Sequence, residues 1–150
     1  MDPYNYEQVQ AVWQRVLEQQ SSPTLRSELE EMIAGEYAAA MGYEKLAKQN
    51  RRYAPMLSAI ARDERRHAHR LTELYRLQWE HSPRIASGVA REALPFSSAI
   101  RAAYGEELAA AKNYRAAAKK WPQHGPLFLS ISSDEQRHSQ ILHRISRNLP

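Results

Sequence analysis

Long stretches of this chain mix Ala and Leu with Glu, Arg and Lys, and glycine is scarce. These residues favour helix over strand, so the pattern predicts an all-α protein. A short leading helix is predicted over about residues 6–19, because apolar side chains recur there on one helical face. That face carries Val9, Val12, Trp13 and Val16.

Four longer helices are predicted after this segment. The break at residues 21–24 contains Pro23 and Thr24, and it supplies a cap for a helix over about residues 25–49. The next helix has Pro55 in its first turn and runs to about residue 80. Two more are predicted over about residues 96–120 and 126–147. The short first and third connections make two antiparallel hairpins.

The connection between the hairpins, residues 81–95, is longer and contains Ser82-Pro83 and Ser87-Gly88. Fifteen extended residues span about 50 Å, whereas a 25-residue helix is about 37 Å long. The connection can therefore cross the whole bundle and stay within one domain. We expect one domain over residues 1–150, with a helical extension at 1–22 and a four-helix bundle at 24–147.

The two hairpins resemble each other in sequence when the chain is shifted by 71 positions. Residues 36–43 then fall on residues 107–114, and both segments begin with Glu and end with Tyr. Residues 63–67, Asp-Glu-Arg-Arg-His, fall on residues 134–138, Asp-Glu-Gln-Arg-His. Neither copy can bury its apolar face alone, so two copies are expected to close into a bundle.

The repeated positions hold metal-ligand residue types at ligand spacing. Each Glu-x-x-His motif places its two side chains on one side of a helix. In each hairpin a further Glu precedes the motif by 28 residues, which puts all the candidates at mid-height. This is the arrangement of di-iron carboxylate sites in bundle cores. The six predicted ligands are Glu36, Glu64, His67, Glu107, Glu135 and His138.

The alternative is a charged helix face with incidental histidines, since a single Glu-x-x-His motif occurs easily by chance. Two copies, each with a matching Glu and Tyr, favour the metal site. Four carboxylates at one height in a core also repel one another unless cations hold them.

Cysteine is absent, which excludes a disulfide framework, a zinc–thiolate site, an iron–sulfur cluster and a cysteine nucleophile. The net charge is +4, but the basic residues are scattered along helices, so a solvated helix face explains them better than a nucleic-acid site. No secretory signal and no membrane span are apparent, so a cytoplasmic protein is expected.

These motifs resemble the ferritin-like superfamily, and most closely its rubrerythrin branch, over about residues 25–147. The resemblance implies a ferritin-like bundle in which Glu64 and Glu135 bridge two metal ions. It implies that Glu36 with His67 completes one ion, and that Glu107 with His138 completes the other.

Four further residues have expected roles around this site. The resemblance implies that Tyr43 and Tyr114 donate hydrogen bonds next to the metal ligands. Asp63 and Asp134 could accept a proton from a ligand histidine ring, or could form ordinary ion pairs with a neighbouring Arg.

The chain departs from the rubrerythrin pattern in two ways. The rubredoxin-like four-cysteine module is missing, so electrons must come from an external donor. Tyr104 stands one turn before Glu107, where the family has an additional Glu. Glu106 is a candidate substitute, although a solvated role fits its helical position better.

Oxygen-rich ligands with two imidazoles suit iron or manganese. The first hypothesis is a two-iron redox enzyme that reduces hydrogen peroxide or dioxygen and forms a homodimer. The alternatives are a ferroxidase or iron-handling protein and a di-manganese catalase-type enzyme. No nucleic acid and no membrane are expected as partners.

Overall fold

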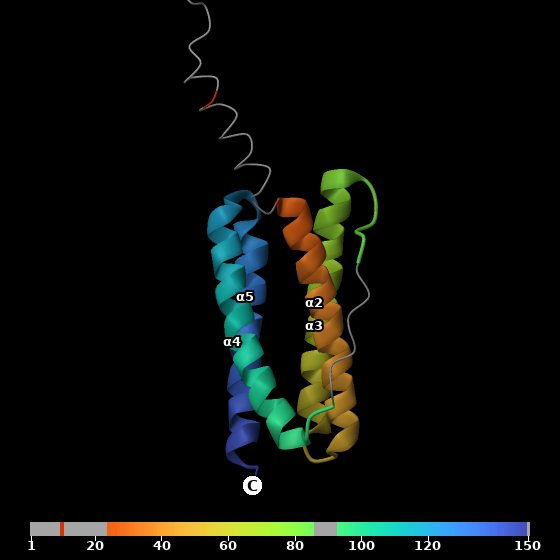
Figure 1. The fold of residues 1–150 in the computed structure, drawn as a ribbon, viewed down its shortest axis with the longest axis vertical. Helices are drawn as coiled ribbons and strands as arrows, with labels where there is room; N and C mark the ends of the chain where they lie inside the picture. Colours follow the sequence, from red (N-terminus) through yellow and green to blue (C-terminus); the bar gives the residue numbers. More distant parts are fainter. Residues whose placement is uncertain (1–9, 11–23, 86–92, 150) are drawn as a thin grey trace, which may run out of the picture.

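The computed structural model describes residue 10, residues 24–85 and residues 93–149, so nearly all of the predicted leading helix lies outside the described residues. In these described parts the chain forms four long α-helices and no strand, which confirms the predicted fold class (Figure 1). The helices are α2 (Leu25–Gln49), α3 (Ala54–Trp79), α4 (Phe96–Lys120) and α5 (Gly125–Arg147), and the short 3₁₀ helix η1 (Pro122–His124) precedes α5.

The predicted helix bounds agree with the structure to within about one residue. At the start of α2, the Thr24 hydroxyl accepts a hydrogen bond from the backbone N–H of Ser27, and the Ser27 hydroxyl accepts one from the N–H of Thr24. This reciprocal pair satisfies two backbone donors that the first helical turn would otherwise leave free. The α3 helix ends at Trp79, and the next residue, Glu80, has a left-handed φ of 56° that turns the chain away from the helix axis.

The four helices are arranged as two antiparallel hairpins, α2 with α3 and α4 with α5 (Figure 1). The α3 helix ends at the same end of the bundle where α2 begins, whereas α4 begins at the opposite end (Figure 1). The connection from α3 to α4 therefore joins opposite ends of the bundle, as its length predicts. This topology brings Glu-x-x-His helices α3 and α5 from separate hairpins into contact.

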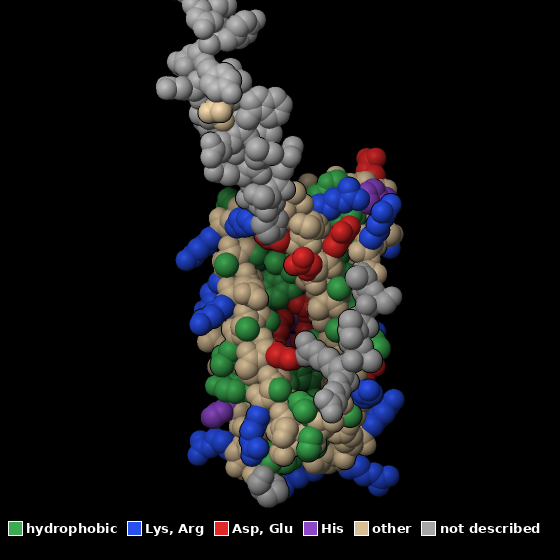
Figure 2. All heavy atoms as spheres, viewed as in Figure 1, with side chains coloured by type: hydrophobic (Ala, Val, Ile, Leu, Met, Phe, Trp, Pro, Cys, Tyr) green, Lys and Arg blue, Asp and Glu red, His purple; other side chains and the backbone are tan. Residues whose placement is uncertain are grey.

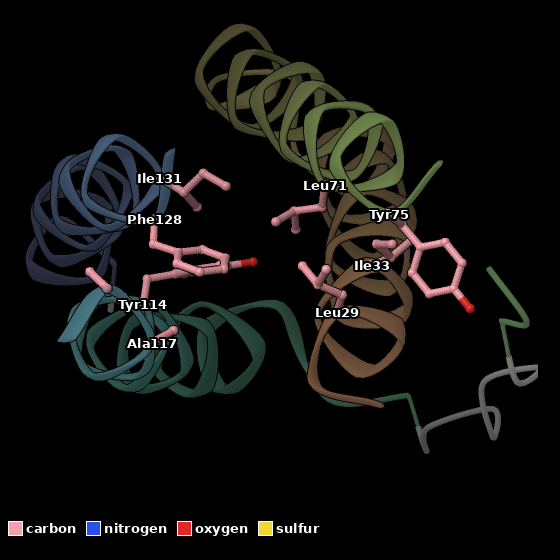
Figure 3. Close-up of a cluster of buried hydrophobic side chains, with 9 residues drawn as sticks. Leu29, Ile33, Leu71, Tyr75, Tyr114, Ala117, Phe128 and Ile131 are labelled. Carbon is pink, nitrogen blue, oxygen red and sulfur yellow. The ribbon is translucent and has the colours of Figure 1, made fainter. Parts of the chain in front are cut away.

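Two clusters of buried apolar residues fill the core, and the predicted metal ligands lie between them along the helices. In the first cluster Leu29, Ile33 and Leu71 of one hairpin face Tyr114, Phe128 and Ile131 of the other (Figure 3). The second cluster, toward the other end of the bundle, includes Tyr43, Leu57, Ile60, Ile100 and Leu142. Burial of these side chains on both sides holds the central polar positions at a fixed height.

None of the described helices is long and apolar enough to span a lipid bilayer. Between the two hairpins the visible face of the molecule is hollowed, and acidic side chains can be seen inside the hollow (Figure 2). The centre of the bundle is therefore polar, in contrast to the apolar clusters toward its two ends.

Candidate metal centre

The structure brings together all six residues predicted as ligands, with every helix of the bundle contributing. Helices α2 and α4 each supply one glutamate, and α3 and α5 each supply a glutamate and a histidine one turn apart. All six side chains are buried, none of them more than 6% exposed. Burying so many ionisable groups is costly unless they are paired or hold ions.

The six residues form two groups of four, and each group could hold one ion. One group contains Glu36 and His67, and the other contains Glu107 and His138. Glu64 and Glu135 belong to both groups. Within each group, one ligand atom from every residue lies within 4.8 Å of the others. If both groups held an ion, Glu64 and Glu135 could therefore contribute a carboxylate to each position.

The histidines present their Nδ1 atoms to the carboxylates at the centre. His67 Nδ1 lies 2.9 Å from Glu135 Oε1 and 3.3 Å from Glu36 Oε2. His138 Nδ1 lies 2.8 Å from Glu64 Oε1 and 3.7 Å from Glu107 Oε2. Each imidazole thus reaches one glutamate of the other hairpin and one glutamate of its own hairpin.

Four side-chain atoms of the predicted ligands are completely buried but have no hydrogen-bond partner. Their chemistry shows whether the site fits metal ions. The four atoms are Glu64 Oε1, Glu107 Oε2, Glu135 Oε1 and His138 Nδ1. Although Glu64 Oε1 and His138 Nδ1 are only 2.8 Å apart, their geometry is not that of a hydrogen bond. Buried polar atoms are nearly always satisfied, so lone pairs that converge without partners fit a pair of cations.

Without cations, burial changes the protonation of the site. Burial raises the pKa of Glu36 to about 8 and that of Glu107 to about 9. Burial alone would lower the pKa of the two histidines, but the surrounding carboxylates outweigh it and raise the pKa of His67 and His138 to about 12. All four groups therefore carry a proton at neutral pH.

The two shared glutamates respond in the opposite direction. Burial would raise the pKa of Glu64 and Glu135, yet contacts with His138 and His67 outweigh burial and lower the pKa of both. The metal-free site then holds two carboxylates, two imidazolium rings and two neutral carboxyl groups, so its net charge is zero. Two divalent ions with four carboxylates and two neutral imidazoles also sum to zero.

This balance predicts the proton stoichiometry of metal binding. Loading both positions at pH 7 should release about four protons per chain, because Glu36, Glu107, His67 and His138 must each lose one. Titration calorimetry in buffers of different ionisation enthalpy measures this number. Release of one proton or none during confirmed loading would contradict the protonation pattern.

Each of the two predicted tyrosine donors contacts a glutamate from the other hairpin. The Tyr43 hydroxyl donates to Glu107 Oε1, and the Tyr114 hydroxyl donates to Glu36 Oε1. Burial, reinforced by the nearby glutamate charge, raises the pKa of both phenols far above their ordinary value. Both tyrosines therefore keep their protons and act as donors that orient the carboxylates.

The two aspartates make both of the contacts that the sequence left open. Asp134 Oδ2 lies 3.0 Å from His67 Nε2, and Asp63 Oδ2 lies 3.1 Å from His138 Nε2. Burial would raise the pKa of each aspartate, but the histidine hydrogen bond and a nearby arginine charge outweigh it and lower the pKa. Ionised aspartates hold a proton on Nε2, so Nδ1 is the atom that can lose its proton and bind a metal.

Arginines hold the aspartates from the solvent side. Arg66 Nη2 lies 2.8 Å from Asp63 Oδ1 and 3.6 Å from Asp134 Oδ2. Arg137 Nη2 lies 3.0 Å from Asp63 Oδ2, and its Nη1 lies 2.9 Å from Asp134 Oδ1. These arginines are not among the residues predicted from the sequence, although they occupy the same position in the two repeats.

Other residues considered from the sequence lie outside the cluster. Glu106 is exposed, in agreement with a solvated position. The Tyr104 ring packs against His143, with 5.2 Å between ring centroids, on the outer side of the α4–α5 hairpin. Neither residue belongs to the two candidate metal groups.

One comparison with known proteins gives a match that is compatible with this geometry. The Rubrerythrin family model matches residues 28–100, which contain Glu36, Glu64 and His67. Over this segment the chain is similar to the Rubrerythrin family. Neither the comparison with curated proteins nor the comparison with solved structures gives a match.

The family match covers the first hairpin and the start of α4. The ligand-type residues Glu107, Glu135 and His138 lie beyond residue 100, so the structure and the internal repeat alone connect them with the first half. The near-symmetric placement of the two halves around Glu64 and Glu135 makes one paired site from both hairpins.

Proposed function

We propose that this rubrerythrin-like protein binds two iron ions and reduces hydrogen peroxide. One observation carries the proposal: two buried four-residue groups share Glu64 and Glu135. Such sharing fits a bridged pair of ions rather than two independent sites. Glu36 and His67 would complete one position, and Glu107 and His138 the other.

The donor set supports iron first and manganese second. Four carboxylates and two imidazoles are harder ligands than the thiolates that select copper, zinc or iron–sulfur clusters. When bound, a bridged pair of ferrous ions supplies the two electrons that peroxide reduction requires.

The protein side chains prepare the site in three ways. Tyr43 and Tyr114 fix the outer oxygens of the α4 and α2 glutamates by hydrogen bonds. Asp63 and Asp134 hold the histidine Nε2 protons, so each ring offers Nδ1 inward. Burial removes the six side chains from bulk water, and the two histidines are fully buried.

Reduction of one peroxide molecule consumes two electrons and two protons and yields two water molecules. The chain contains no cysteine and therefore no cysteine-bound iron that could supply the electrons. We therefore propose an external electron donor for turnover. We also propose a homodimer, which analytical ultracentrifugation would test.

The test is a comparison of oxidants in a stopped-flow instrument. Protein loaded with ferrous iron should be oxidised in one rapid turnover by hydrogen peroxide, and more slowly by dioxygen at the same concentration. A matched control is Tyr53→Phe, because the Tyr53 hydroxyl is buried without a partner and is not part of the site. This variant should react like the wild type.

Other outcomes of the same experiment would support a different function. Much faster reaction with dioxygen would move it to an oxidase or ferroxidase, and a large assembly in solution would then indicate iron storage. Preferential manganese loading with peroxide disproportionation would indicate a catalase-type enzyme. No reaction with either oxidant would remove the enzymatic proposal.

A further inference from the structure

We propose that the seam between α3 and α5 is the docking site for an acidic one-electron carrier protein. The seam arginines are Arg62, Arg66, Arg70 and Arg137. The inference rests on the proposed redox function, because a carrier is needed only if the site is turned over. It adds the location of the electron donor and the charge of its contact surface.

The first observation is the charge of the two helices. Together α3 and α5 contain eight arginines and no lysine. Apart from the buried Glu64 and Glu135, they contain three acidic residues, Asp63, Glu73 and Asp134. Solvent-facing charge on this part of the molecule is therefore strongly positive.

The second observation is that four of these arginines gather along one line. Arg62, Arg66 and Arg70 are spaced by four residues and so lie on one face of α3. Arg137 of α5 joins them through the shared contacts with Asp63, and Arg70 reaches the Ser130 hydroxyl of α5 at 3.2 Å. The side chains of Arg66 and Arg137 are each 53% exposed, so a partner can reach them.

The third observation is a short hydrogen-bonded route from these arginines to the predicted metal ligands. Arg137 Nη2 is 3.0 Å from Asp63 Oδ2, which is 3.1 Å from Nε2 of the fully buried His138. In the symmetric route, Asp134 connects the same guanidinium to His67. Two hydrogen bonds thus lead from solvent to an imidazole of the site.

On the opposite side of the site, the described residues form no arginine–aspartate chain of this kind. There the outer carboxylate oxygens of Glu36 and Glu107 end on the hydroxyls of Tyr114 and Tyr43. Both tyrosines are only 4% exposed. A donor that docks at the α3–α5 seam therefore approaches the buried site along a path of two hydrogen bonds from exposed arginines.

The arginine side chains of the seam favour a partner that carries carboxylates on its contact surface. Guanidinium groups pair with carboxylates through two parallel hydrogen bonds, and they lose less on desolvation than ammonium groups. A second copy of this chain would bring arginines against arginines, which like-charge repulsion disfavours. An acidic carrier protein satisfies the charge of the seam and supplies the electrons that the chain cannot store on cysteine-bound iron.

The electron count requires two encounters for each peroxide molecule. Each reduced carrier gives up one electron and leaves in its oxidised form. Two such transfers, with two protons taken from solvent, balance the reduction of one peroxide to two water molecules. Rapid exchange between carriers favours a polar contact that depends on ionic strength.

The experiment uses an acidic plant-type [2Fe–2S] ferredoxin as the probe and the metal-loaded full chain as its partner. Binding is measured by titration calorimetry at low and at physiological salt. The variant Arg62→Glu/Arg70→Glu reverses two seam charges without touching Asp63, Asp134 or the ligands. Lys112→Glu/Arg115→Glu is the matched control, with the same charge change on exposed α4 positions.

We expect the seam variant to weaken ferredoxin binding by about tenfold or more at low salt, and the control to change it by less than about threefold. The oxidation rate of reduced ferredoxin on mixing should fall in parallel. The milder variant Arg62→Gln/Arg70→Gln should give an intermediate loss, which guards against a folding defect in the charge reversal. Metal content and helical circular dichroism should match the wild type.

Three results would overturn the proposal. One is absence of ferredoxin binding to wild type at low salt, and another is equal weakening by the seam and control variants. The third is tighter seam-dependent binding of duplex DNA than of ferredoxin. Failure of the proposed function is distinguishable, because chemically reduced protein would then not react with peroxide or dioxygen, whereas seam-dependent binding would still be measured.

Discussion

Replacing Glu64 or Glu135 with Ala is expected to abolish paired metal binding, while the wild-type chain binds two ions. Each of these glutamates belongs to both candidate groups, so its loss removes a ligand from both positions at once. Mutation of residues that only hydrogen-bond to metal ligands already lowers metal affinity by about 10- to 100-fold. Loss of a shared ligand should exceed that range.

A histidine replacement should have a smaller and one-sided effect. His67 belongs to only one group, so His67→Ala should leave the second position, with Glu107 and His138, partly occupied. Elemental analysis after equilibrium dialysis gives the number of ions per chain for each variant. Calorimetric titration then separates one binding step from two.

The control for this series is Glu31→Ala, which removes an exposed glutamate from α2. It should retain two ions per chain with unchanged affinity. One ion per fully loaded wild-type chain would refute the paired site. So would two tightly bound ions in Glu64→Ala.

Removal of metal is expected to lower the melting temperature of the protein on the order of 10 °C. An ion present at about 1,000 times its dissociation constant stabilises the folded state by about 4 kcal/mol. For a chain of this length, about 1 kcal/mol corresponds to about 2–4 °C. Differential scanning calorimetry of loaded and metal-free protein measures the difference.

The stability of the metal-free protein should also fall as the pH rises from about 5 to 9. Glu36 and Glu107 have an ordinary pKa of 4.5, and burial raises it to about 8 and about 9 in the folded state. Between these values the folded state binds more protons than the unfolded state, so the free energy of unfolding decreases with pH. His67 and His138, raised from 6.5 to about 12, contribute in the same direction above about pH 6.5.

Metal affinity should rise with pH, because the ligands must lose their protons to bind metal. The difference in melting temperature between loaded and metal-free protein should therefore widen with rising pH. The double variant Glu36→Gln/Glu107→Gln removes two of the titrating groups and should flatten the pH dependence of the metal-free form. Identical melting curves with and without confirmed metal would contradict the prediction.

The sequence alone determined the helices, their approximate ends and the six predicted ligand positions. Its apolar pattern and the break before Thr24 located α2, and a shift of 71 residues exposed the two Glu-x-x-His motifs. These features are local or repeat along the chain, so they can be recognised without knowing which helices touch. The equal spacing from Glu36 to Glu64 and from Glu107 to Glu135 also predicted that all six candidate ligands lie at the same level along the bundle axis.

Only the tertiary structure decided how the supporting contacts are paired. From the sequence, Asp63 could contact His67, four residues later on the same helix, as readily as any residue of the other hairpin. In the structure Asp63 holds His138, and Asp134 holds His67. The tyrosines cross between hairpins in the same way. The reason is physical: two nearly identical repeats offer the same partners, and only the packing of α3 against α5 decides which copy is within reach.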